Sequence, residues 1–267
     1  MAVYRGKTIV LTGASQGIGR ALALGLAEQR PRLVLAARDK AALHTVADEC
    51  RAKGADVLVV PTDVADEGQC RSLVEQAVAR FKVVDVLVNN AGIGMIARFE
   101  ALSDLSVYER LMKVNYLGCV YPTYYALPHL RASRGQIVVM ASLAGLTGVP
   151  TRTGYAASKH AVIGFFDSLR VELRGSGVAV TVVCPYFVRS EIHRRAVGSD
   201  GKALGTTPMK EGHLMTAEEC ARLTVAAMEK RQRMLVMTAK GKLGRLLKLV
   251  APGLVDRIAE RAVKQGR

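Results

Sequence analysis

The sequence contains no tryptophan, and only 5% of its 267 residues are aromatic. It is also short of acidic residues, with 23 Asp and Glu against 38 Lys and Arg, so the formal net charge is +15. No window of about 18 residues is free of charge, and the N-terminal segment has no long apolar region preceded by basic residues. We therefore expect neither a membrane-spanning helix nor a signal peptide, and we expect the fold to begin at the N-terminus.

Cysteine is scarce and shows no pattern. The five cysteines are odd in number and widely separated, with no C-x-x-C pair and no histidine at ligand spacing: Cys50, Cys70, Cys119, Cys184 and Cys220. This excludes a disulfide framework and a zinc site as the organising element of the fold. We expect five buried thiols in a reducing compartment, which places the protein in the cytoplasm.

Apolar residues, in contrast, make up half of the chain. A chain of this length and composition can bury a full core, which excludes intrinsic disorder. The surplus of positive charge attracts anions at long range, so nucleic acid, an anionic membrane surface and anionic ligands are all candidate partners. Composition alone does not choose among the three.

Short β-branched runs alternate along the chain with longer helical patterns. The strand candidates are 8–12, 32–37, 56–61, 84–90, 135–142 and 178–185, and the helical segments are 17–29, 39–53, 66–81, 104–131 and 153–174. Several of the strand runs are almost continuously apolar, which is typical of strands covered by helices on both faces. This order predicts an α/β fold, a single Rossmann-type doubly wound parallel sheet with helices on both faces.

The pattern changes after Pro185. Residues 186–215 are rich in glycine and lack periodicity, which predicts a long loop or lid in place of a core element. Thr216 and Glu219 form a capping box that opens a helix to about residue 230, and 234–238 is a candidate last strand. We expect residues 1–238 to form the catalytic domain and residues 239–267 to form a basic amphipathic tail, with a helical pattern over 242–263 that is broken near Pro252.

A glycine-rich turn, TGASQGIG, joins the first strand to the first helix. Such a turn lets the backbone approach a pyrophosphate and directs the helix N–H groups toward it. Gly13 would permit the tight turn, Gly17 the close approach, and Gly19 the packing of helix on strand. The spacing is G-x-x-x-G-x-G, and by itself such a turn is also compatible with a purely structural role.

The second strand ends in AAR, residues 36–38. A site for NAD usually has a carboxylate here for the ribose hydroxyls, whereas a site for NADP has a cation for the 2′-phosphate. Ala37 holds the acidic position and Arg38 follows it, so the pattern favours NADP(H). The alternative is a solvated arginine at a helix start, with Asp39 as its neighbour or as the helix cap.

Tyr155 and Lys159 are one helical turn apart in YAASK. Residues at this spacing share a helix face, so the phenol and the ammonium can address one bound cofactor. A tyrosine ordinarily has a pKa near 10, and a fixed neighbouring cation favours its phenolate. Ser142 lies 13 residues earlier, at the end of a predicted strand, where its hydroxyl would lie beside the tyrosine.

These motifs, together with NNAG at 89–92 and Asn115 in KVNYLG, resemble the short-chain dehydrogenase/reductase superfamily in order and spacing over roughly residues 5–230. The resemblance implies that Tyr155 is the acid/base and that Ser142 orients the substrate oxygen. It implies that Lys159 binds the nicotinamide ribose and lowers the tyrosine pKa, and that Asn115 holds a water that relays protons. Both Ser142 and Tyr155 would contact substrate.

The resemblance also implies a set of cofactor-binding residues. Asp63 would contact the adenine amino group, with Val64 on the ring. The family motif after the sixth strand is PG-x-V-x-T, but this chain has PYFVRS, with Tyr186 in place of the glycine and Ser190 in place of the threonine. The full set is Gly13, Ser15, Gln16, Gly17, Ile18, Gly19, Arg38, Asp63, Val64, Asn90, Ala91, Gly92, Tyr155, Lys159, Pro185, Val188 and Ser190. No metal is implied.

Within the superfamily, MASLAG, ALPHL and TAEECA resemble the branch that contains 11β-hydroxysteroid dehydrogenase, and KLVAPGLVDRI resembles the dehydrogenase/reductase member 7 group. The resemblance implies NADP(H) and lipophilic carbonyls or alcohols of steroid, retinoid or fatty-acyl type. Many of those proteins have an N-terminal membrane anchor, which we do not expect here. The lid's Tyr186, Phe187, Leu204, Met209, Leu214 and Met215 agree with a lipophilic substrate.

The positive charge is concentrated at the C-terminus. Residues 231–267 contain ten Lys and Arg against two acidic residues, interleaved with leucine and valine. Such a helix can lie on an anionic membrane surface as a peripheral contact, or it can pack its apolar face on its own domain or on a partner subunit. Nucleic acid is not expected, because the tail has no aromatic side chains for base stacking.

We therefore expect an NADP(H)-dependent oxidoreductase that interconverts a carbonyl and a primary or secondary alcohol. The family also implies a homo-oligomer, a dimer or tetramer, built through the helices of 104–131 and 153–174. The alternative is an NADP(H)-sensing or membrane-associating binding protein of the same fold without turnover.

Overall fold

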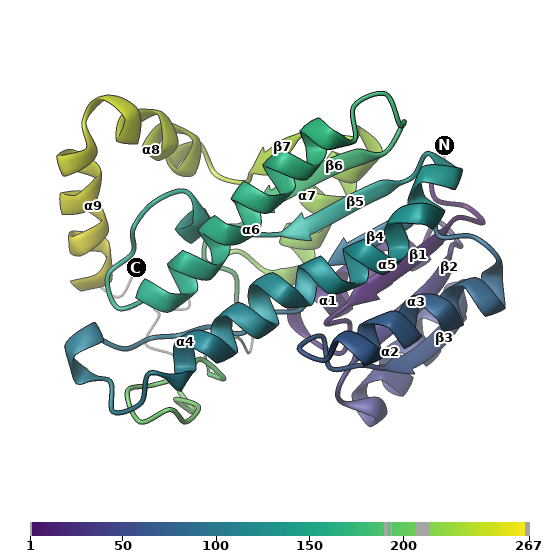
Figure 1. Cartoon of the computed structure of the whole chain (residues 1–267), viewed down its shortest axis with the longest axis horizontal. Coiled ribbons are helices and arrows are strands. Elements are labelled where there is room, and N and C mark those ends of the chain that lie inside the picture. The colour runs from purple at the N-terminus through teal and green to yellow at the C-terminus, as the bar shows by residue number, and fades with distance from the viewer. Residues whose placement is uncertain (1, 190–191, 193, 207–213, 265–267) are drawn as a thin grey trace.

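A computed structural model of the chain describes residues 2–189, 192, 194–206 and 214–264, except for the side chains of 262–264. Its centre is a parallel sheet in the order β3-β2-β1-β4-β5-β6-β7 (Figure 1). The strands are β1 (Thr8–Thr12), β2 (Arg32–Ala37), β3 (Asp56–Pro61), β4 (Val86–Asn89), β5 (Gln136–Met140), β6 (Ala179–Cys184) and β7 (Met234–Val236). Every predicted strand is present, so the predicted α/β fold class is confirmed.

Helices cover both faces of this sheet. One layer contains α1 (Gly17–Ala27), α2 (Lys40–Ala52) and α7 (Ala217–Glu229); the other contains α3 (Glu67–Phe81), α5 (Gly118–Ser133) and α6 (Thr153–Glu172). Successive residues of a strand face opposite sides, so Ile9 and Leu11 of β1 pack in the first layer while Val10 packs in the second. All three are fully buried, and this two-sided burial explains the continuously apolar strands.

The helix predicted over 104–131 is interrupted. The chain forms α4 (Ser106–Leu111), then a π-helical turn (Met112–Leu117), and then α5. Contacts with other elements surround the wider turn, because the Asn115 amide bonds to the backbone of Ile93 and Gly118 lies against Val64. A π-turn adds one residue to the helix and re-aims the side chains beside it. The helical periodicity of the sequence does not predict the π-turn, because these contacts involve residues distant in the chain.

The lid is described in part. Val188 pairs with Met215, so the two ends of the loop lie together, and Val197 pairs with Met95, which attaches the loop to the segment after β4. The predicted lid residue Met209 lies outside the described residues. Beyond the loop, the Thr216 hydroxyl caps α7 by accepting from the Glu219 N–H, as the capping box predicts, while the Glu219 carboxylate pairs with Arg222.

The tail forms two helices, α8 (Ala239–Val250) and α9 (Pro252–Lys264), which make an arm beyond the end of the sheet (Figure 1). The break falls at Pro252, as the sequence predicts. The arm is tied to the domain where the Lys248 ammonium donates to the Leu146 carbonyl (2.9 Å) and where Gly241 lies against the Leu143 side chain. No residue of α8 is buried.

In the described part of the chain, no helix is long and apolar enough to cross a bilayer. The five cysteines are buried and free, as expected from their spacing. Burial raises the pKa of the Cys119 thiol to about 11 and that of Cys220 to about 12. These thiols are therefore protonated at neutral pH and serve the core as small apolar side chains.

Candidate active site

The site lies at the carboxyl edge of the sheet, where β1 separates β2 from β4 and the strand order reverses. Crevices at this point of open parallel sheets are where ligands bind. The first wall is the glycine turn between β1 and α1. Gly13 has a φ of +65°, and a Cβ on Gly19 would lie 2.0 Å from the Gly13 carbonyl oxygen. Only glycine fits at either position, and the two glycines let the backbone of the turn pack directly against the first turn of α1.

This turn has the properties of an anion site. Gln16 is the N-cap of α1 and provides no side-chain cap, and the first turn of the helix has no acidic residue. The free N–H groups and the positive end of the helix dipole therefore face the cavity without a competing carboxylate. Both properties fit the pyrophosphate of a dinucleotide.

A polar cluster fixes the turn from the neighbouring strand. The Asn90 amide donates to the carbonyls of Thr12 (2.9 Å) and Gly13 (3.1 Å), and the Thr12 hydroxyl accepts from the backbone N–H groups of Asn90 and Ala91. Thr12 is fully buried. These hydrogen bonds fix the end of β4 against the glycine turn, so the distance between these two walls of the cavity is constant.

At the adenosine end, Arg38 is exposed at the edge of the cavity and Asp39 caps α2 by accepting from Ala42 N (3.0 Å). Asp39 is therefore the helix cap, and its carboxylate is committed to the backbone, which leaves the role of Arg38 open. Asp63 closes a turn with Ala65 N (3.0 Å), which sets its carboxylate at the cavity wall.

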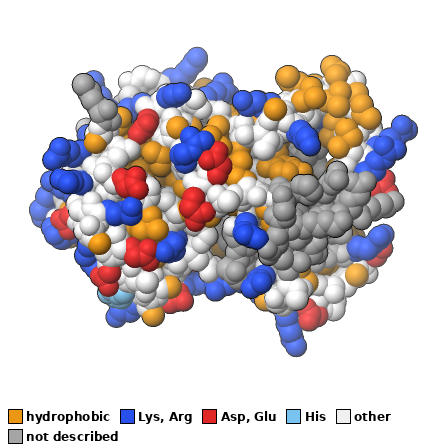
Figure 2. Space-filling view, turned by 180° about the vertical axis from the view of Figure 1, so that it is seen from behind, with side chains coloured by type: hydrophobic (Ala, Val, Ile, Leu, Met, Phe, Trp, Pro, Cys, Tyr) orange, Lys and Arg blue, Asp and Glu red, His pale blue; other side chains and the backbone are white. Residues whose placement is uncertain are grey.

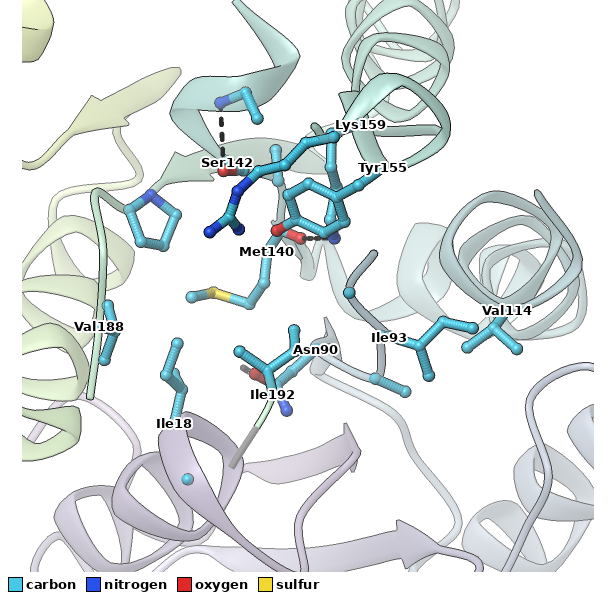
Figure 3. A pocket seen from close by; sticks show the side chains of 18 of the residues that line it. Ile18, Asn90, Ile93, Val114, Met140, Ser142, Tyr155, Lys159, Val188 and Ile192 are labelled. Carbon is cyan, nitrogen blue, oxygen red and sulfur yellow. Dashed lines mark hydrogen bonds between the residues drawn. The ribbon is translucent and has the colours of Figure 1, made fainter. Parts of the chain in front are cut away.

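One cavity of about 1060 Å³ joins these groups, just above the usual range of about 300–1,000 Å³ for ligand sites. Figure 3 shows Ser142, Tyr155 and Lys159 on one side of the space, with Ile18 and Asn90 across from them. The predicted residues that line it are Gly13, Ser15, Gln16, Gly17, Ile18, Gly19, Arg38, Asp63, Val64, Asn90, Ala91, Gly92, Ser142, Tyr155, Lys159, Pro185 and Val188. Residues far apart in the sequence thus share one site.

Backbone groups hold Lys159 and Ser142 of this wall. Lys159 is 4% exposed, and its ammonium donates to the Met140 carbonyl at the end of β5 (2.7 Å) and lies 5.8 Å from the centre of the Tyr155 ring. The Ser142 oxygen accepts from Ala144 N (3.1 Å), which leaves its O–H to donate into the cavity. A hydroxyl donor, a phenol and a buried cation can together polarise a carbonyl and protonate its oxygen.

Asn115 lies behind this wall and not among the cavity-lining residues. Its carbonyl oxygen accepts from Ile93 N (2.8 Å), and its amide donates to Ile93 O and to the Ser158 hydroxyl, both at 3.0 Å. The side chain is fully buried. It therefore fixes the loop after β4, at Ile93, against α6, next to Tyr155 and Lys159.

The PYFVRS segment tolerates the loss of its glycine. The non-glycine residues with positive φ do not include Tyr186, so its backbone needs no left-handed conformation there. The Tyr186 ring is in edge contact with Phe187, their centres 4.8 Å apart. Ser190, predicted to contact the cofactor, lies outside the described residues.

Comparison with known proteins decides the family. The family model described as short chain dehydrogenase matches residues 7–199, most of the chain. The chain belongs to the short-chain dehydrogenase family. This dehydrogenase is 36% identical over 259 residues to a Dictyostelium discoideum protein named dehydrogenase/reductase SDR family protein 7-like, covering 95% of this chain and 80% of the relative. It is 36% identical over 258 residues to an 11-beta-hydroxysteroid dehydrogenase of Pinus massoniana, covering 94% and 72%.

Solved structures agree with the fold of this dehydrogenase. A short-chain dehydrogenase/reductase from Burkholderia phymatum in complex with NAD superposes with a TM-score of 0.84 at 30% identity, covering 95% of this chain and 96% of the other. An alcohol dehydrogenase from the archaeon Thermococcus sibiricus, complexed with 5-hydroxy-NADP, superposes with a TM-score of 0.75 at 26% identity, covering 86% and 94%. The dehydrogenase is an oxidoreductase of a family whose members bind NAD or NADP.

Sequence reasoning missed several residues of the dehydrogenase site. Arg152 lines the cavity three residues before Tyr155, and that spacing on one helix face could have predicted it. The tail also contributes to the wall through Lys240, Gly241, Gly244, Arg245, Val255, Ile258 and Ala259. No local signal in the sequence predicts that the tail returns to the active site.

Proposed function

We propose that the protein is an NADP(H)-dependent oxidoreductase that interconverts a carbonyl and a primary or secondary alcohol. The supporting observation is the common wall of Ser142, Tyr155 and Lys159 on the cavity that also contains the glycine turn. Bound nicotinamide would supply or accept the hydride. The chain's own residues hold the substrate oxygen and move its proton.

In the reductive direction, the Ser142 hydroxyl donates a hydrogen bond to the carbonyl oxygen and the Tyr155 phenol gives that oxygen its proton. The Lys159 ammonium, fixed on Met140 O, stabilises the phenolate that results. The oxidative direction reverses these transfers. Asn115 acts by holding Ile93 and Ser158, and a water beside it would return the proton from bulk.

The preference for NADP(H) over NAD(H) rests on Arg38. Ala37 leaves the usual acidic position without charge, Asp39 is committed to the α2 cap, and Arg38 is exposed at the cavity edge. A guanidinium there can bind the 2′-phosphate through paired N–H groups. The remaining predicted cofactor contacts, from Gly13 to Val188, line the same cavity.

We further propose a lipophilic substrate, because Leu143, Leu146, Val149, Phe187, Val255 and Ile258 line the cavity around Tyr155. The name of the Pinus massoniana relative agrees with this class. Residues 1–238 would form the catalytic domain with 186–215 as its lid, and 239–267 a tail that makes a peripheral membrane contact. A homo-oligomer through α4 to α6 completes the proposal.

Carbonyl-dependent oxidation of NADPH tests this function. We expect activity on part of a panel of lipophilic aldehydes and ketones, and we expect Tyr155→Phe to lower kcat by about 100- to 10,000-fold because the proton donor is lost. The Kd of the variant for NADPH, measured by fluorescence, should stay within about 2-fold of the wild-type value. This measurement is the control that the variant is folded. Wild-type rates in Tyr155→Phe would refute the mechanism, and binding of NADPH without turnover of any compound would favour a non-catalytic sensor.

A further inference from the structure

Helix α9 presents an apolar face to the active-site cavity. Its described residues that line the cavity are Val255, Ile258 and Ala259, whose spacing places them on one side of the helix. The charged residues of the same helix do not line it: Asp256, Arg257, Glu260 and Arg261. The end of a ligand that reaches this face therefore meets apolar side chains. A polar group at that end would lose its water without gaining a hydrogen bond from them.

The protein covers this apolar wall only in part. Val255 is buried, but Ile258 is 51% exposed and belongs to the same wall. Leu143 and Leu146, which follow Ser142 in the chain and line the same cavity, are half-buried. An apolar ligand that covers these side chains removes their surface from water, which favours binding. A substrate with an apolar tail can supply this cover.

The arm is attached beside the catalytic serine. Ser142 is the N-cap of the short 3-10 helix that follows β5. Gly241 of α8 lies so close to Leu143 that a Cβ would be 2.8 Å from the Leu143 Cδ1 atom, and the Lys248 ammonium donates to the Leu146 carbonyl (2.9 Å). Both contacts are with the turn that Ser142 opens, so one segment holds the serine and the arm together.

The joint between α8 and α9 passes this fixed position on to α9 (Figure 1). The Ala251 N–H donates to the Leu247 carbonyl (2.7 Å), and the Ala251 carbonyl accepts from the Leu254 N–H (3.1 Å). Pro252 is the first residue of α9, and its ring fixes one backbone angle there. The α9 face is therefore held at a set distance from Ser142, and the cavity between them has a set length.

We propose that the substrate is a long-chain aliphatic aldehyde or ketone, or the matching alcohol, and that α9 sets the length of its tail. The oxygen lies at Ser142 and Tyr155, and the end of the chain contacts Val255 and Ile258. Ile258 is the specificity-determining residue, because it is the more exposed of these two large side chains. A fused-ring compound with a polar group at each end would place the second group against the apolar face. This proposal rests on the proposed function, which it makes specific for shape.

A series of straight-chain aldehydes tests the proposal. NADPH-dependent reduction of butanal, hexanal, octanal, decanal and dodecanal is measured below their solubility limits. In wild type we expect kcat/KM to rise by about 2- to 4-fold for each added methylene until the chain reaches α9, and then to level off. The rise should come from KM with kcat nearly constant, because contacts with the tail are equal in the ground state and the transition state.

Ile258→Trp places a larger side chain at the far end of the cavity. We expect the ratio of kcat/KM for decanal to that for butanal to fall by about 10-fold, the equivalent of about two methylene contacts. Leu254→Trp is the matched control, because Leu254 is on the same helix, is 48% exposed against 51% for Ile258, and does not line the cavity. In this control the ratio should stay within about 2-fold of wild type, since no methylene contact is lost.

A binding measurement separates tail length from chemistry. Butyramide and decanamide are not reduced by NADPH, and calorimetry gives their Kd for protein saturated with NADPH. We expect wild type to bind decanamide at least about 10-fold more tightly than butyramide, and we expect Ile258→Trp to lose most of this difference while Leu254→Trp keeps it.

A flat chain-length profile in wild type, equal ratios in the two tryptophan variants, or an equal loss on short and long aldehydes in Ile258→Trp would overturn the proposal and leave the proposed function intact. No reduction of any aldehyde or ketone by wild type would count against the function itself. The amides then decide on the tail alone, because equal binding of butyramide and decanamide would overturn the role of α9.

Discussion

At the scale of single residues, the site depends on side chains that bind backbone. Asn90 holds the glycine turn through Thr12 O and Gly13 O, and Lys159 is fixed by Met140 O. Backbone partners cannot rotate away as side chains do, so each functional group has one position before any ligand arrives. Such preorganisation lowers the cost of binding and of proton transfer.

Arg38 permits a sharp test at this scale. Removing its guanidinium should weaken NADPH by about 10- to 100-fold in Kd, because one or two charge-assisted hydrogen bonds to the 2′-phosphate are lost. The Kd for NADH should change by less than about 2-fold. Fluorescence titration of Arg38→Ala with both cofactors gives the ratio, and Arg32→Ala, an exposed arginine at the opposite end of β2, is the control. Equal loss for both cofactors would contradict the assignment.

At the scale of elements, the tail has two faces with different surroundings. Val255, Ile258 and Ala259 of α9 line the cavity. Leu243, Leu246, Leu249 and Val250 of α8 are 63–81% exposed, and Figure 2 shows apolar side chains gathered at this end of the molecule with Lys and Arg around them. In this chain the domain leaves most of the α8 apolar face uncovered. An apolar stripe edged by cations complements an anionic bilayer.

We expect the full chain to co-sediment with phosphatidylglycerol vesicles and not with phosphatidylcholine vesicles, and the bound fraction to fall at high salt. Leu246→Glu with Leu249→Glu should abolish binding, because the apolar contact is lost and the added charge is repelled. Leu105→Glu with Val171→Glu makes the same change at exposed apolar residues of other segments and should keep binding. Equal binding of the two double variants would refute membrane contact through α8.

At the scale of the whole molecule, the sheet and its two helix layers bury all five thiols. Burial raises the pKa of Cys70, Cys184 and Cys220 from 9.0 to about 12, and that of Cys50 and Cys119 to about 11. The folded protein therefore keeps these protons at a pH where the unfolded chain releases them. Unfolding becomes more favourable as pH rises above about 9, and the loss of stability continues to about 11 to 12.

Denaturant unfolding between pH 8 and 11 measures this effect. Each thiol should lower the free energy of unfolding by up to about 1.4 kcal/mol per pH unit within that window. Cys220→Ala removes one titrating group, so its stability should fall less steeply with pH than that of wild type, whatever its stability at pH 8. Parallel curves for the two proteins would show that Cys220 is not protected by the fold.

Local pattern by itself determined the order of strands and helices, the parallel sheet, the glycine turn and the tyrosine–lysine pair. These features depend on residues within one or two turns of each other, or on whether a strand is covered on both faces, and both leave a periodic trace in the chain. The break at Pro252 is local for the same reason, because proline removes a helical hydrogen bond wherever it stands.

Tertiary structure alone decided which of these elements share a cavity. The π-turn at Asn115 is stabilised by hydrogen bonds to Ile93 and Ser158. The tail contacts the site through the hydrogen bond between Lys248 and Leu146, which are 102 residues apart. Arg152 is buried, and its guanidinium lies over the Phe187 ring, because the lid packs against the start of α6. Contacts of this kind arise from packing between distant segments, so no short-range pattern records them. The part of the cavity lined by Arg152, Leu146 and the tail is therefore a property of the folded molecule.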